Sequence, residues 1–306
     1  MKKMIAIVAG DPNSINSEII AKAWKKIKEK KNLFLIGNYQ LIKKQLNQIG
    51  LSIPLFKIDL IKHYKNDGRL YVLDVPFKFK SIFKNKSNDT KNYVLKSLDI
   101  AHNLAFKKKI RGFINAPIDK KIFNNKYLGV TEYLSKKNNI KNKEVMMIFN
   151  KELAVVPLTT HLEIKDVTGK IKPSLLKTKI TTLHKSYKKL FNKKPKIVVL
   201  GLNPHNSENY SNSIENKIIK PVVNSLIKLD FNIKGPFPAD TIFSNQKKFN
   251  YNVVVGMYHD QVLAPFKALY GYNAINITLG LKYIRISPDH GIARDIVGQN
   301  KANPIS

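Results

Sequence analysis

Cysteine is absent from the chain, which excludes disulfide bonds and thiolate metal sites. Long apolar runs are absent too, since none approaches the roughly 20 residues that a membrane-spanning helix needs. The apolar stretch at residues 4–9 is too short for the core of a secretory signal and continues directly into Gly-Asp-Pro. We therefore expect a cytoplasmic protein with no membrane partner.

Arginine and acidic residues are scarce. Aspartate and glutamate together number 21 against 54 lysines and arginines, so the formal net charge is +33, yet only Arg69, Arg111, Arg285 and Arg294 are arginines. Proteins that read base edges favour the bidentate arginine fork, and the lysines here are scattered rather than gathered in one stripe. We expect no nucleic-acid partner and interpret the charge as solvated helix faces that also attract phosphorylated metabolites.

Two nucleotide-binding motifs are also missing. The chain has no G-x-G-x-x-G and no G-x-x-x-x-G-K-[ST], so neither a standard Rossmann site nor a P-loop is indicated. The segment GDPNSINSE, residues 10–18, follows an apolar run and opens a helical pattern. It predicts either an anion bound at a helix N-terminus or a plain turn capped by Asn13 or Ser14.

Short apolar runs alternate with helical patterns along the chain, which predicts an α/β fold with a mostly parallel sheet and helical crossovers. At 43% hydrophobic residues, the length suits one large domain or two of ordinary size. We expect a loop at 84–92. Strands are predicted at 4–9, 33–37, 71–75, 112–116, 152–158, 196–202, 251–257 and 273–279, and helices at 18–30, 91–109, 173–191 and 214–229.

Three of the apolar runs end in a histidine: His161, His205 and His259. Ligands of open α/β sheets bind beyond the carboxyl ends of strands. A single histidine there is more often a satisfied polar residue than a ligand, but three in equivalent positions predict a shared site for Zn²⁺, Co²⁺ or Mn²⁺ with one open position. We interpret His63, His102 and His184 as ordinary surface or half-buried residues.

Such a metal would suit the oxidation of an alcohol. A bound metal lowers the pKa of water from about 16 to about 7, on the order of 12 kcal/mol. A general base supplies only about 3–5 kcal/mol, so a carboxylate need only carry the proton away. Asp260 and Asp240 are the candidate catalytic residues, although Asp240 could equally be a helix N-cap.

An anion site is indicated by Arg285, which lies inside an apolar segment. Its planar fork could bind a phosphate or carboxylate ligand, or pair with a structural aspartate. Lys267 could add a second positive charge, and Asn276 a side-chain hydrogen bond from a strand.

Several segments follow one another along the chain. They are GDP (10–12), NAPIDK (115–120), GVTEYL (129–134), TTHLEIKDV (159–167), GLNPHNSE (201–208), GPFPADTIF (235–243), MYHDQVLAPFK (257–267), NITLGLKYIRIS (276–287) and DHGIARDIVGQNKAN (289–303). Taken together, these segments resemble the 4-hydroxythreonine-4-phosphate dehydrogenase family of pyridoxal phosphate synthesis. The resemblance covers nearly the whole chain, and the last segment is also similar to isopropylmalate and isocitrate dehydrogenases.

The resemblance implies a homodimer of two-domain subunits with an isopropylmalate dehydrogenase-like fold. Residues 1–128 and 275–306 would form a terminal domain, and 129–274 a central domain with the dimer interface. The active site would lie at the subunit interface, where His161, His205 and His259 from both subunits bind Zn, Co, Mg or Mn. Substrate would contact Thr131, Lys267, Asn276 and Arg285. The cofactor, NAD or NADP, would contact His290, Gly291, Ala293, Asp295, Ile296 and Asn303.

The implied reaction is the metal-dependent, NAD-linked oxidation of 4-phosphohydroxy-L-threonine. The resulting 3-oxo acid loses CO₂ to give 3-amino-2-oxopropyl phosphate. Some residues depart from the family pattern: GDPAGIGPE reads GDPNSINSE, G-H-T-E reads G-V-T-E with Val130, and the family continues into a further helix after the equivalent of residue 306. These departures leave two alternatives open, a dehydrogenase of erythronate or threonate 4-phosphate and a non-catalytic relative that binds a phosphorylated ligand.

Overall fold

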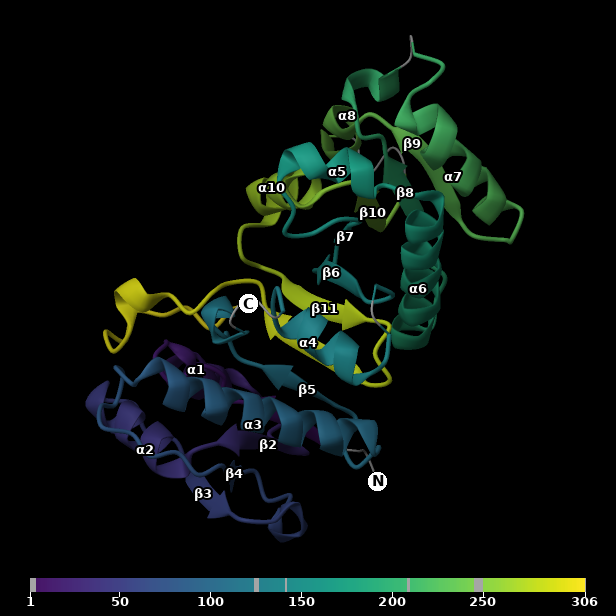
Figure 1. Ribbon diagram of the computed structural model, residues 1–306. Helices are drawn as coiled ribbons and strands as arrows, with labels where there is room; N and C mark the ends of the chain where they lie inside the picture. Colours follow the sequence, from purple (N-terminus) through teal and green to yellow (C-terminus); the bar gives the residue numbers. More distant parts are fainter. Residues whose placement is uncertain (1–3, 124–126, 141, 208–209, 245–249, 306) are drawn as a thin grey trace. The chain divides into compact units, whose positions relative to one another are not determined.

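The structure is a computed structural model that describes residues 4–123, 127–140, 142–207, 210–244 and 250–305 (Figure 1). The chain divides into two compact units. Unit 1 comprises Met1–Leu134 and Lys282–Ser306, and unit 2 comprises Ser135–Leu281. Both units are built from strands and helices, so the α/β class predicted from the sequence is confirmed.

Unit 1 contains a parallel sheet in the order β3-β4-β2-β1-β5-β12. Its strands are β1 (Ile5–Val8), β2 (Leu33–Gly37), β3 (Leu55–Ile58), β4 (Leu70–Asp74), β5 (Gly112–Asn115) and β12 (Ile284–Pro288). Its helices are α1 (Asn16–Lys26), α2 (Tyr39–Gln48), η1 (Ile61–His63), α3 (Ser87–Phe106), η2 (Lys120–Phe123) and η5 (Arg294–Ile296), and α4 (Val130–Lys137) crosses its boundary with unit 2.

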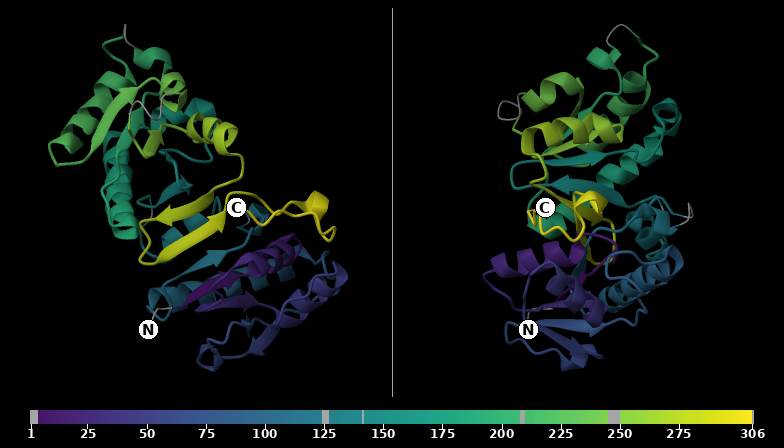
Figure 2. Two further views of the ribbon diagram at one scale, coloured as in Figure 1. Left: turned by 180° about the vertical axis from the view of Figure 1, so that it is seen from behind. Right: turned by 90° about the vertical axis from the view of Figure 1, so that its left-hand side faces the viewer.

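The core of unit 1 forms because its helices present apolar faces to the buried strands. On one side, α1 and α2 pack Trp24 and Leu46 against Leu35 and Val72 of the sheet. Helix α3 lies on the opposite side of these strands (Figure 2). Trp24 is the only tryptophan of the chain and is 1% exposed, so it contributes a large share of this apolar burial.

Unit 2 contains a mixed sheet in the order β11-β6-β7-β10-β8-β9. The β11–β6 and β6–β7 pairs are antiparallel, and the pairs from β7 onward are parallel. Its strands are β6 (Val145–Phe149), β7 (Ala154–Pro157), β8 (Ile197–Leu200), β9 (Ile233–Phe237), β10 (Val253–Gly256) and β11 (Ile275–Leu279). Its helices are α5 (Ile164–Lys170), α6 (Pro173–Phe191), η3 (Pro204–Ser207), the π-helical η4 (Glu215–Ile219), α7 (Lys220–Ile227), α8 (Ala239–Ser244) and α10 (His259–Tyr270).

The core of unit 2 is formed mainly by α10 and α8 against the parallel strands. Val262 and Phe266 of α10 and Ile242 of α8 pack on Val198 and Val254 of β8 and β10. These strands are buried along their whole length, which explains their continuous runs of β-branched residues. Helices α6 and α7 pack against each other beside the same sheet (Figure 1).

Most predicted elements are present with shorter ends. All eight strand-like runs contain a strand, and the helix predicted at 173–191 is α6 over the same residues. The loop predicted at 84–92 is partly wrong, because α3 begins at Ser87. Strands β3, β6, β9 and β12 were not predicted. Within the described residues, every helix is either too short or too polar to cross a membrane.

Gly112 allows β5 to pair closely with β12. A Cβ atom at this position would lie 2.1 Å from the carbonyl oxygen of Ile284, a backbone atom that cannot move without shifting the strand. We expect Gly112→Ala to lower the free energy of unfolding by about 1–3 kcal/mol, as overpacked cores do. Thermal and urea denaturation measure this change.

Gly169→Ala is the matched control. This glycine lies in α5 with open space around its Cβ position, so alanine should stabilise the helix by about 0.5–1 kcal/mol. Equal effects of the two substitutions would contradict the packing argument.

Candidate functional site

The three strand-end histidines lie at one edge of the unit 2 sheet. Strand β10 pairs in parallel with both β7 and β8, so the carboxyl ends of all three strands point the same way. His161 follows β7, His205 lies in η3 after β8, and His259 is the first residue of α10 after β10. This is the edge at which open α/β sheets bind their ligands.

Two of these histidines are close together. The ring centroids of His161 and His259 are 6.0 Å apart with an interplanar angle of 34°. Two imidazoles whose nitrogens share one zinc ion, at about 2.0–2.1 Å each, have centroids about 5–6 Å apart. Nδ1 of His259 lies 2.6 Å from Oδ1 of Asp260, which leaves Nε2 for a ligand. A carboxylate on the second ring nitrogen is the usual partner of a metal-binding histidine.

His205 is at the same sheet edge but does not join this pair. Within the described part of the chain, no group of three or more histidine and acidic side chains is arranged to hold a metal ion. His205 is exposed and has a φ of 50°, and Asn206 and Ser207 continue the left-handed conformation with φ values of 56° and 50°. One chain therefore brings together two of the three predicted ligands. Asp240 is exposed in the first turn of α8, so it is not the N-cap of that helix.

Arg285 is held in the interior of unit 1 at only 3% exposure. Its Nε donates a hydrogen bond of 2.7 Å to Oδ1 of Asn115, and one terminal nitrogen lies 3.5 Å from Oγ1 of Thr131. Burial lowers the pKa of the Arg285 guanidinium to about 10, against the opposing effect of the nearby Glu132 carboxylate. The predicted substrate residues Arg285 and Thr131 are thus in contact.

The other two predicted substrate residues lie in unit 2. Lys267 is half-buried in α10, with its Nζ 5.0 Å from the centre of the Tyr272 ring. Asn276 lies in β11, and its buried Oδ1 has no hydrogen-bond partner among the described residues. Buried polar atoms are normally satisfied, so an unpaired amide oxygen indicates a place for a ligand donor.

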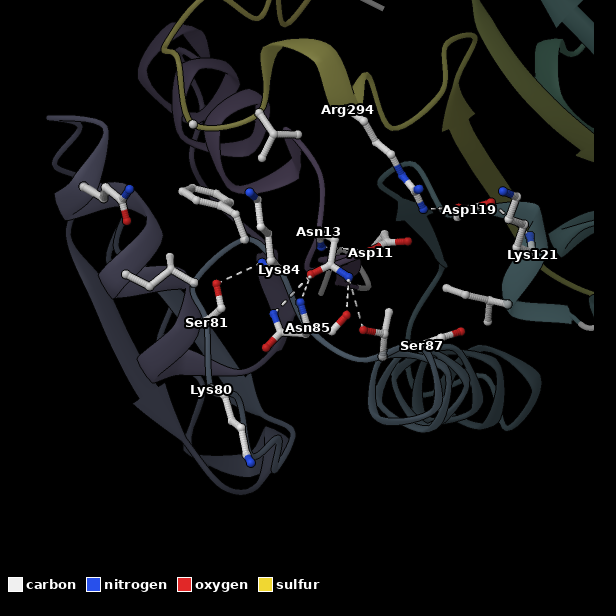
Figure 3. A pocket seen from close by; sticks show the side chains of 17 residues that line it. Asp11, Asn13, Lys80, Ser81, Lys84, Asn85, Ser87, Asp119, Lys121 and Arg294 are labelled. Atoms are coloured by element: carbon white, nitrogen blue, oxygen red, sulfur yellow. Dashed lines mark hydrogen bonds and ion pairs between the residues drawn. The ribbon is translucent and has the colours of Figure 1, made fainter.

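Unit 1 also contains a cavity of about 1000 Å³ (Figure 3). Four cationic and two acidic side chains lie on its wall, together with the loop that follows β1. The lining residues are Asp11, Asn13, Gln48, Lys80, Ser81, Ile82, Phe83, Lys84, Asn85, Ser87, Thr90, Asp119, Lys121, Ile122, Arg294, Val297 and Gly298. The charge pattern suits a ligand that carries both phosphates and hydroxyl groups.

Two carboxylates and one arginine of this cavity affect one another. Burial raises the pKa of Asp11, as does the negative charge of Asp119, while the backbone N–H of Asn13 lowers it through a 2.8 Å hydrogen bond. Arg294 reaches Oδ2 of Asp119 at 2.5 Å (Figure 3). An acidic group and a basic group are therefore held beside the nearly buried Asp11.

The segment GDPNSINSE is a tightly bonded turn rather than an exposed polar loop. Oγ of Ser14 donates a hydrogen bond to the carbonyl oxygen of Asp11 at 2.5 Å. Nδ2 of Asn16 donates to the carbonyl oxygens of Ala9 and Pro117, at 2.9 and 2.8 Å. The capping prediction is borne out in part: the residue at the N-cap position of α1 is Ile15, which makes no side-chain cap, but Oγ of Ser14 accepts a hydrogen bond of 3.2 Å from the N–H of Asn16, the first residue of the helix. Ser14 and Asn16 thus satisfy backbone groups of their own loop, and Asn16 also bonds to the segment that contains Pro117.

Asn13 has a different role, because it joins this loop to the segment before α3. Its Oδ1 accepts a hydrogen bond from the N–H of Asn85 at 2.8 Å, and its Nδ2 lies 3.2 Å from the carbonyl oxygen of Asn85 (Figure 3). This reciprocal pair forms part of the cavity wall.

The six predicted cofactor residues lie near the cavity but not on its described lining. Their sequence neighbours Arg294, Val297 and Gly298 do line it. Ala293 and Ile296 pack against a small apolar cluster around Ile15 and Ile19. The remaining four make local contacts. Nδ1 of His290 lies 2.9 Å from the carbonyl oxygen of Gly291. The carbonyl oxygen of Asp295 accepts a hydrogen bond from the side chain of Gln299, and Oδ1 of Asn303 accepts one from the N–H of Ile305.

Sequence reasoning missed several residues of these sites. Asp11 and Asp119 belong to the quoted GDP and NAPIDK segments, so their motifs offered a signal that was not used. The lysines of the cavity, Lys80, Lys84 and Lys121, could not be told apart from the many others in the chain.

Comparison with known proteins decides the family. A family profile described as "Pyridoxal phosphate biosynthetic protein PdxA" matches residues 29–306. The chain belongs to the PdxA family. The family resemblance inferred from its motifs is thereby confirmed.

Relatives of the PdxA family cover almost the whole chain. A 4-hydroxythreonine-4-phosphate dehydrogenase of Sulfurihydrogenibium sp. is 36% identical over 99% of this chain and 94% of its own. The crystal structure of the enzyme of that name from Klebsiella pneumoniae is 28% identical, with a TM-score of 0.86 over 99% of this chain and 95% of its own. A β-decarboxylating dehydrogenase from Thermococcus kodakarensis, 10% identical with a TM-score of 0.52 over 100% of this chain and 80% of its own, shares the fold alone.

Asp11 should make stability depend on pH. Its raised pKa means that the folded chain binds this proton more tightly than the unfolded chain, so its contribution to stability is present below about pH 4 and is lost as pH rises through the folded pKa. Asparagine mimics the protonated carboxyl, so we expect Asp11→Asn to raise the melting temperature at pH 7. The rise should be about 2–4 °C for each kcal/mol added to the free energy of unfolding, and it should become smaller as pH falls toward 4.

Calorimetry across this pH range measures the difference. Asp59→Asn is the control, because that side chain is 79% exposed and should change the melting temperature little at any pH. A destabilised Asp11→Asn protein at pH 7, or a gain that does not vary with pH, would contradict the burial argument.

Proposed function

We propose that the chain is a 4-hydroxythreonine-4-phosphate dehydrogenase that uses NAD, or NADP, and a divalent metal ion. Membership of the PdxA family and the names of the relatives support the substrate and the oxidation. The observation that carries the metal dependence is the His161–His259 pair at the carboxyl edge of the unit 2 sheet, with Asp260 on the second ring nitrogen of His259.

The donor set fits a divalent metal of borderline softness. Three imidazoles without any thiolate suit Zn²⁺ or Co²⁺, and Mn²⁺ or Mg²⁺ would require additional oxygen ligands. Because His205 does not join the other two within one chain, we assign the completed site to a homodimer in which both subunits contribute histidines. When bound, the ion would stabilise the developing negative charge on the substrate hydroxyl oxygen.

Arg285 and Thr131 are assigned to the anionic end of the substrate. The guanidinium of Arg285 is desolvated, and its planar fork is suited to pair with a phosphate or carboxylate. Lys267 and Asn276 are assigned to the remaining polar groups, since the buried Oδ1 of Asn276 can accept from a substrate hydroxyl or ammonium group.

The cavity of unit 1 is assigned to the nicotinamide cofactor. Its volume, about 1000 Å³, is that of a large ligand site. Lys84, Lys121 and Arg294 can neutralise a pyrophosphate, and Asp11 and Asp119 can accept hydrogen bonds from ribose hydroxyls. His290, Gly291, Ala293, Asp295, Ile296 and Asn303 remain the proposed cofactor segment on sequence grounds, with Arg294, Val297 and Gly298 added by the cavity.

In the proposed reaction the C3–H bond breaks as a hydride passes to the nicotinamide ring, and the C3 hydroxyl loses its proton. Asp260 and Asp240 stay the candidates to carry this proton, and Asp260 also orients His259. The C1–C2 bond of the 3-oxo acid then breaks, CO₂ leaves, and the electron pair enters the ketone before C2 is protonated. The product is 3-amino-2-oxopropyl phosphate. A phosphorylated metabolic substrate fits the predicted cytoplasmic location.

A second substrate class is favoured by Val130. This residue is half-buried at the start of α4, next to Thr131, and replaces the histidine of the family pattern. A lost hydrogen-bond donor beside the anion site penalises a substrate that would use it. The alternative is therefore a dehydrogenase of erythronate or threonate 4-phosphate.

We expect NADH formation from 4-phosphohydroxy-L-threonine to require both NAD and a divalent metal. Excess chelator should abolish it, and metal addition should restore it. His205→Ala should lower kcat/KM at least 10³-fold, because a metal ligand is lost, whereas His63→Ala, on exposed η1, should not. Full activity of His205→Ala or of chelated protein would exclude the metal mechanism. Thermal stabilisation by the substrate without NADH formation would identify a non-catalytic relative.

Substrate choice is measured by kcat/KM on 4-phosphohydroxy-L-threonine and on erythronate 4-phosphate with the same enzyme. We expect at least a tenfold preference for the amino acid. Val130→His should raise kcat/KM for the amino acid by about 10-fold or more, since a good hydrogen bond to substrate is worth at least that factor. A preference for the sugar acid would support the alternative.

A further inference from the structure

We propose that Thr159, Gln261 and Glu215 are positioning residues that join the three histidine-bearing loops of unit 2 into one continuous chain of hydrogen bonds. The inference rests on the proposed metal site at His161, His205 and His259. It concerns what holds the backbone of those histidines in place, which the family resemblance does not address.

Thr159 links the first two loops. Its hydroxyl donates to the carbonyl oxygen of Met257 at 2.7 Å, and its backbone N–H donates to the same oxygen at 3.2 Å. Thr159 precedes His161 by two residues, and Met257 precedes His259 by two residues. The backbone segments that lead into the His161–His259 pair therefore share a single acceptor.

Gln261 links the second loop to the third. Its Oε1 accepts from the N–H of Met257 at 2.7 Å, and its Nε2 donates to the carbonyl oxygen of Gly201 at 2.7 Å. One amide thus spans the carboxyl ends of β10 and β8, which lead to His259 and His205. Gly256 leaves room for this amide, because a Cβ there would lie 2.9 Å from Oε1 of Gln261.

Glu215 fixes the far end of the chain. It is 1% exposed, and its Oε1 accepts from the N–H groups of Leu202 and Asn203 at 2.8 Å each. Both of its oxygens also lie 3.2 Å from Nδ2 of Asn203. A buried carboxylate is costly unless such donors surround it, so its position in the π-helical turn η4 is coupled to the loop that carries His205.

The histidines themselves need this support because packing does not fix them. His161 and His205 are exposed, and the His259 side chain is 37% exposed. His161 and His205 also have φ values of 55° and 50°, a conformation that L-residues adopt only when their surroundings impose it. A metal site demands ligand atoms within a fraction of an ångström, and partners outside the ligand set supply that precision.

The test is the affinity for Co²⁺, measured by visible absorption and by competition with a chelator in the full-length protein. Gln261→Met keeps the size of the side chain and removes both hydrogen bonds. We expect its Co²⁺ affinity to fall 10–100-fold, the usual effect of losing a partner of a metal ligand. Activity should return largely at saturating metal, so that kcat recovers while the apparent KM for metal stays raised.

Gln45→Met is the matched control. Gln45 lies in unit 1, where its Nε2 donates to the carbonyl oxygens of Pro12 and Ile82 at 2.8 and 2.7 Å. The substitution also removes two side-chain hydrogen bonds to backbone, so it should lower the melting temperature without changing Co²⁺ affinity. Equal losses of affinity in both variants would show a general loss of stability and overturn the inference.

Two further variants keep the inference falsifiable if Gln261→Met does not fold. Thr159→Val is isosteric and removes only the hydroxyl bond to Met257, so we expect a smaller, several-fold loss of affinity. Glu215→Gln keeps an acceptor oxygen and should retain more affinity than Glu215→Ala.

If Gln261→Met binds Co²⁺ as tightly as the wild-type protein, the positioning role is overturned and the metal site is left intact. If Gln261→Met does not fold, wild-type Co²⁺ affinity in both Thr159→Val and Glu215→Ala has the same meaning. A wild-type protein whose Co²⁺ binding is absent, or unchanged by His161→Ala, would overturn the metal site itself and this inference with it.

Discussion

The parallel pairing of β7, β10 and β8 is the constraint on which the candidate active site depends. Parallel strands end at one edge, so three segments far apart in the chain deliver their following residues to the same place. The strands are buried on both faces and carry no polar side chains of their own. Chemistry is therefore confined to the residues after the strands, where a histidine can reach solvent and ligand without disturbing the core.

Burial of charge is a second feature, and it is found twice in unit 1. Asp11 and Arg285 are each 3% exposed, and desolvation opposes ionisation in both, raising one pKa and lowering the other. Asp11 lies next to Asp119 and Arg294, and Arg285 next to Asn115 and Thr131. Burying a charge costs stability, and a ligand that contacts the buried group can offset that cost because it replaces lost hydration with direct contacts.

The sequence predicted the sheet class and the positions of most strands because buried strands leave continuous apolar runs. It also placed the three histidines correctly after β7, β8 and β10. The start of α3 was missed because its first turn, from Ser87, is polar and has the composition of a loop. Strand β12 was missed because Arg285 interrupts its apolar pattern, which is the same feature that makes it a candidate ligand residue.

Other features depend on partners that no local pattern contains. Gln261 bonds to Gly201, and Asn13 bonds to Asn85, across 60 and 72 residues of sequence. Asn13 and Ser14 were both expected from residue type to cap α1, but only Ser14 contacts a helix N–H, that of Asn16, while its hydroxyl donates to the carbonyl of Asp11. Asn13 instead bonds to the segment before α3. The role of a polar residue is set by the fold around it rather than by its preference in isolated turns.

The side chain of Asn16 points inward and occupies the space above Gly10, where a Cβ atom would lie 2.5 Å from Nδ2 of Asn16 and 2.6 Å from the carbonyl oxygen of Pro117. The polar side chains of Ser14 and Asn16 are both accommodated beneath the surface. Residues 10 and 16 compete for the same space, so a side chain at position 16 of this size requires glycine at position 10.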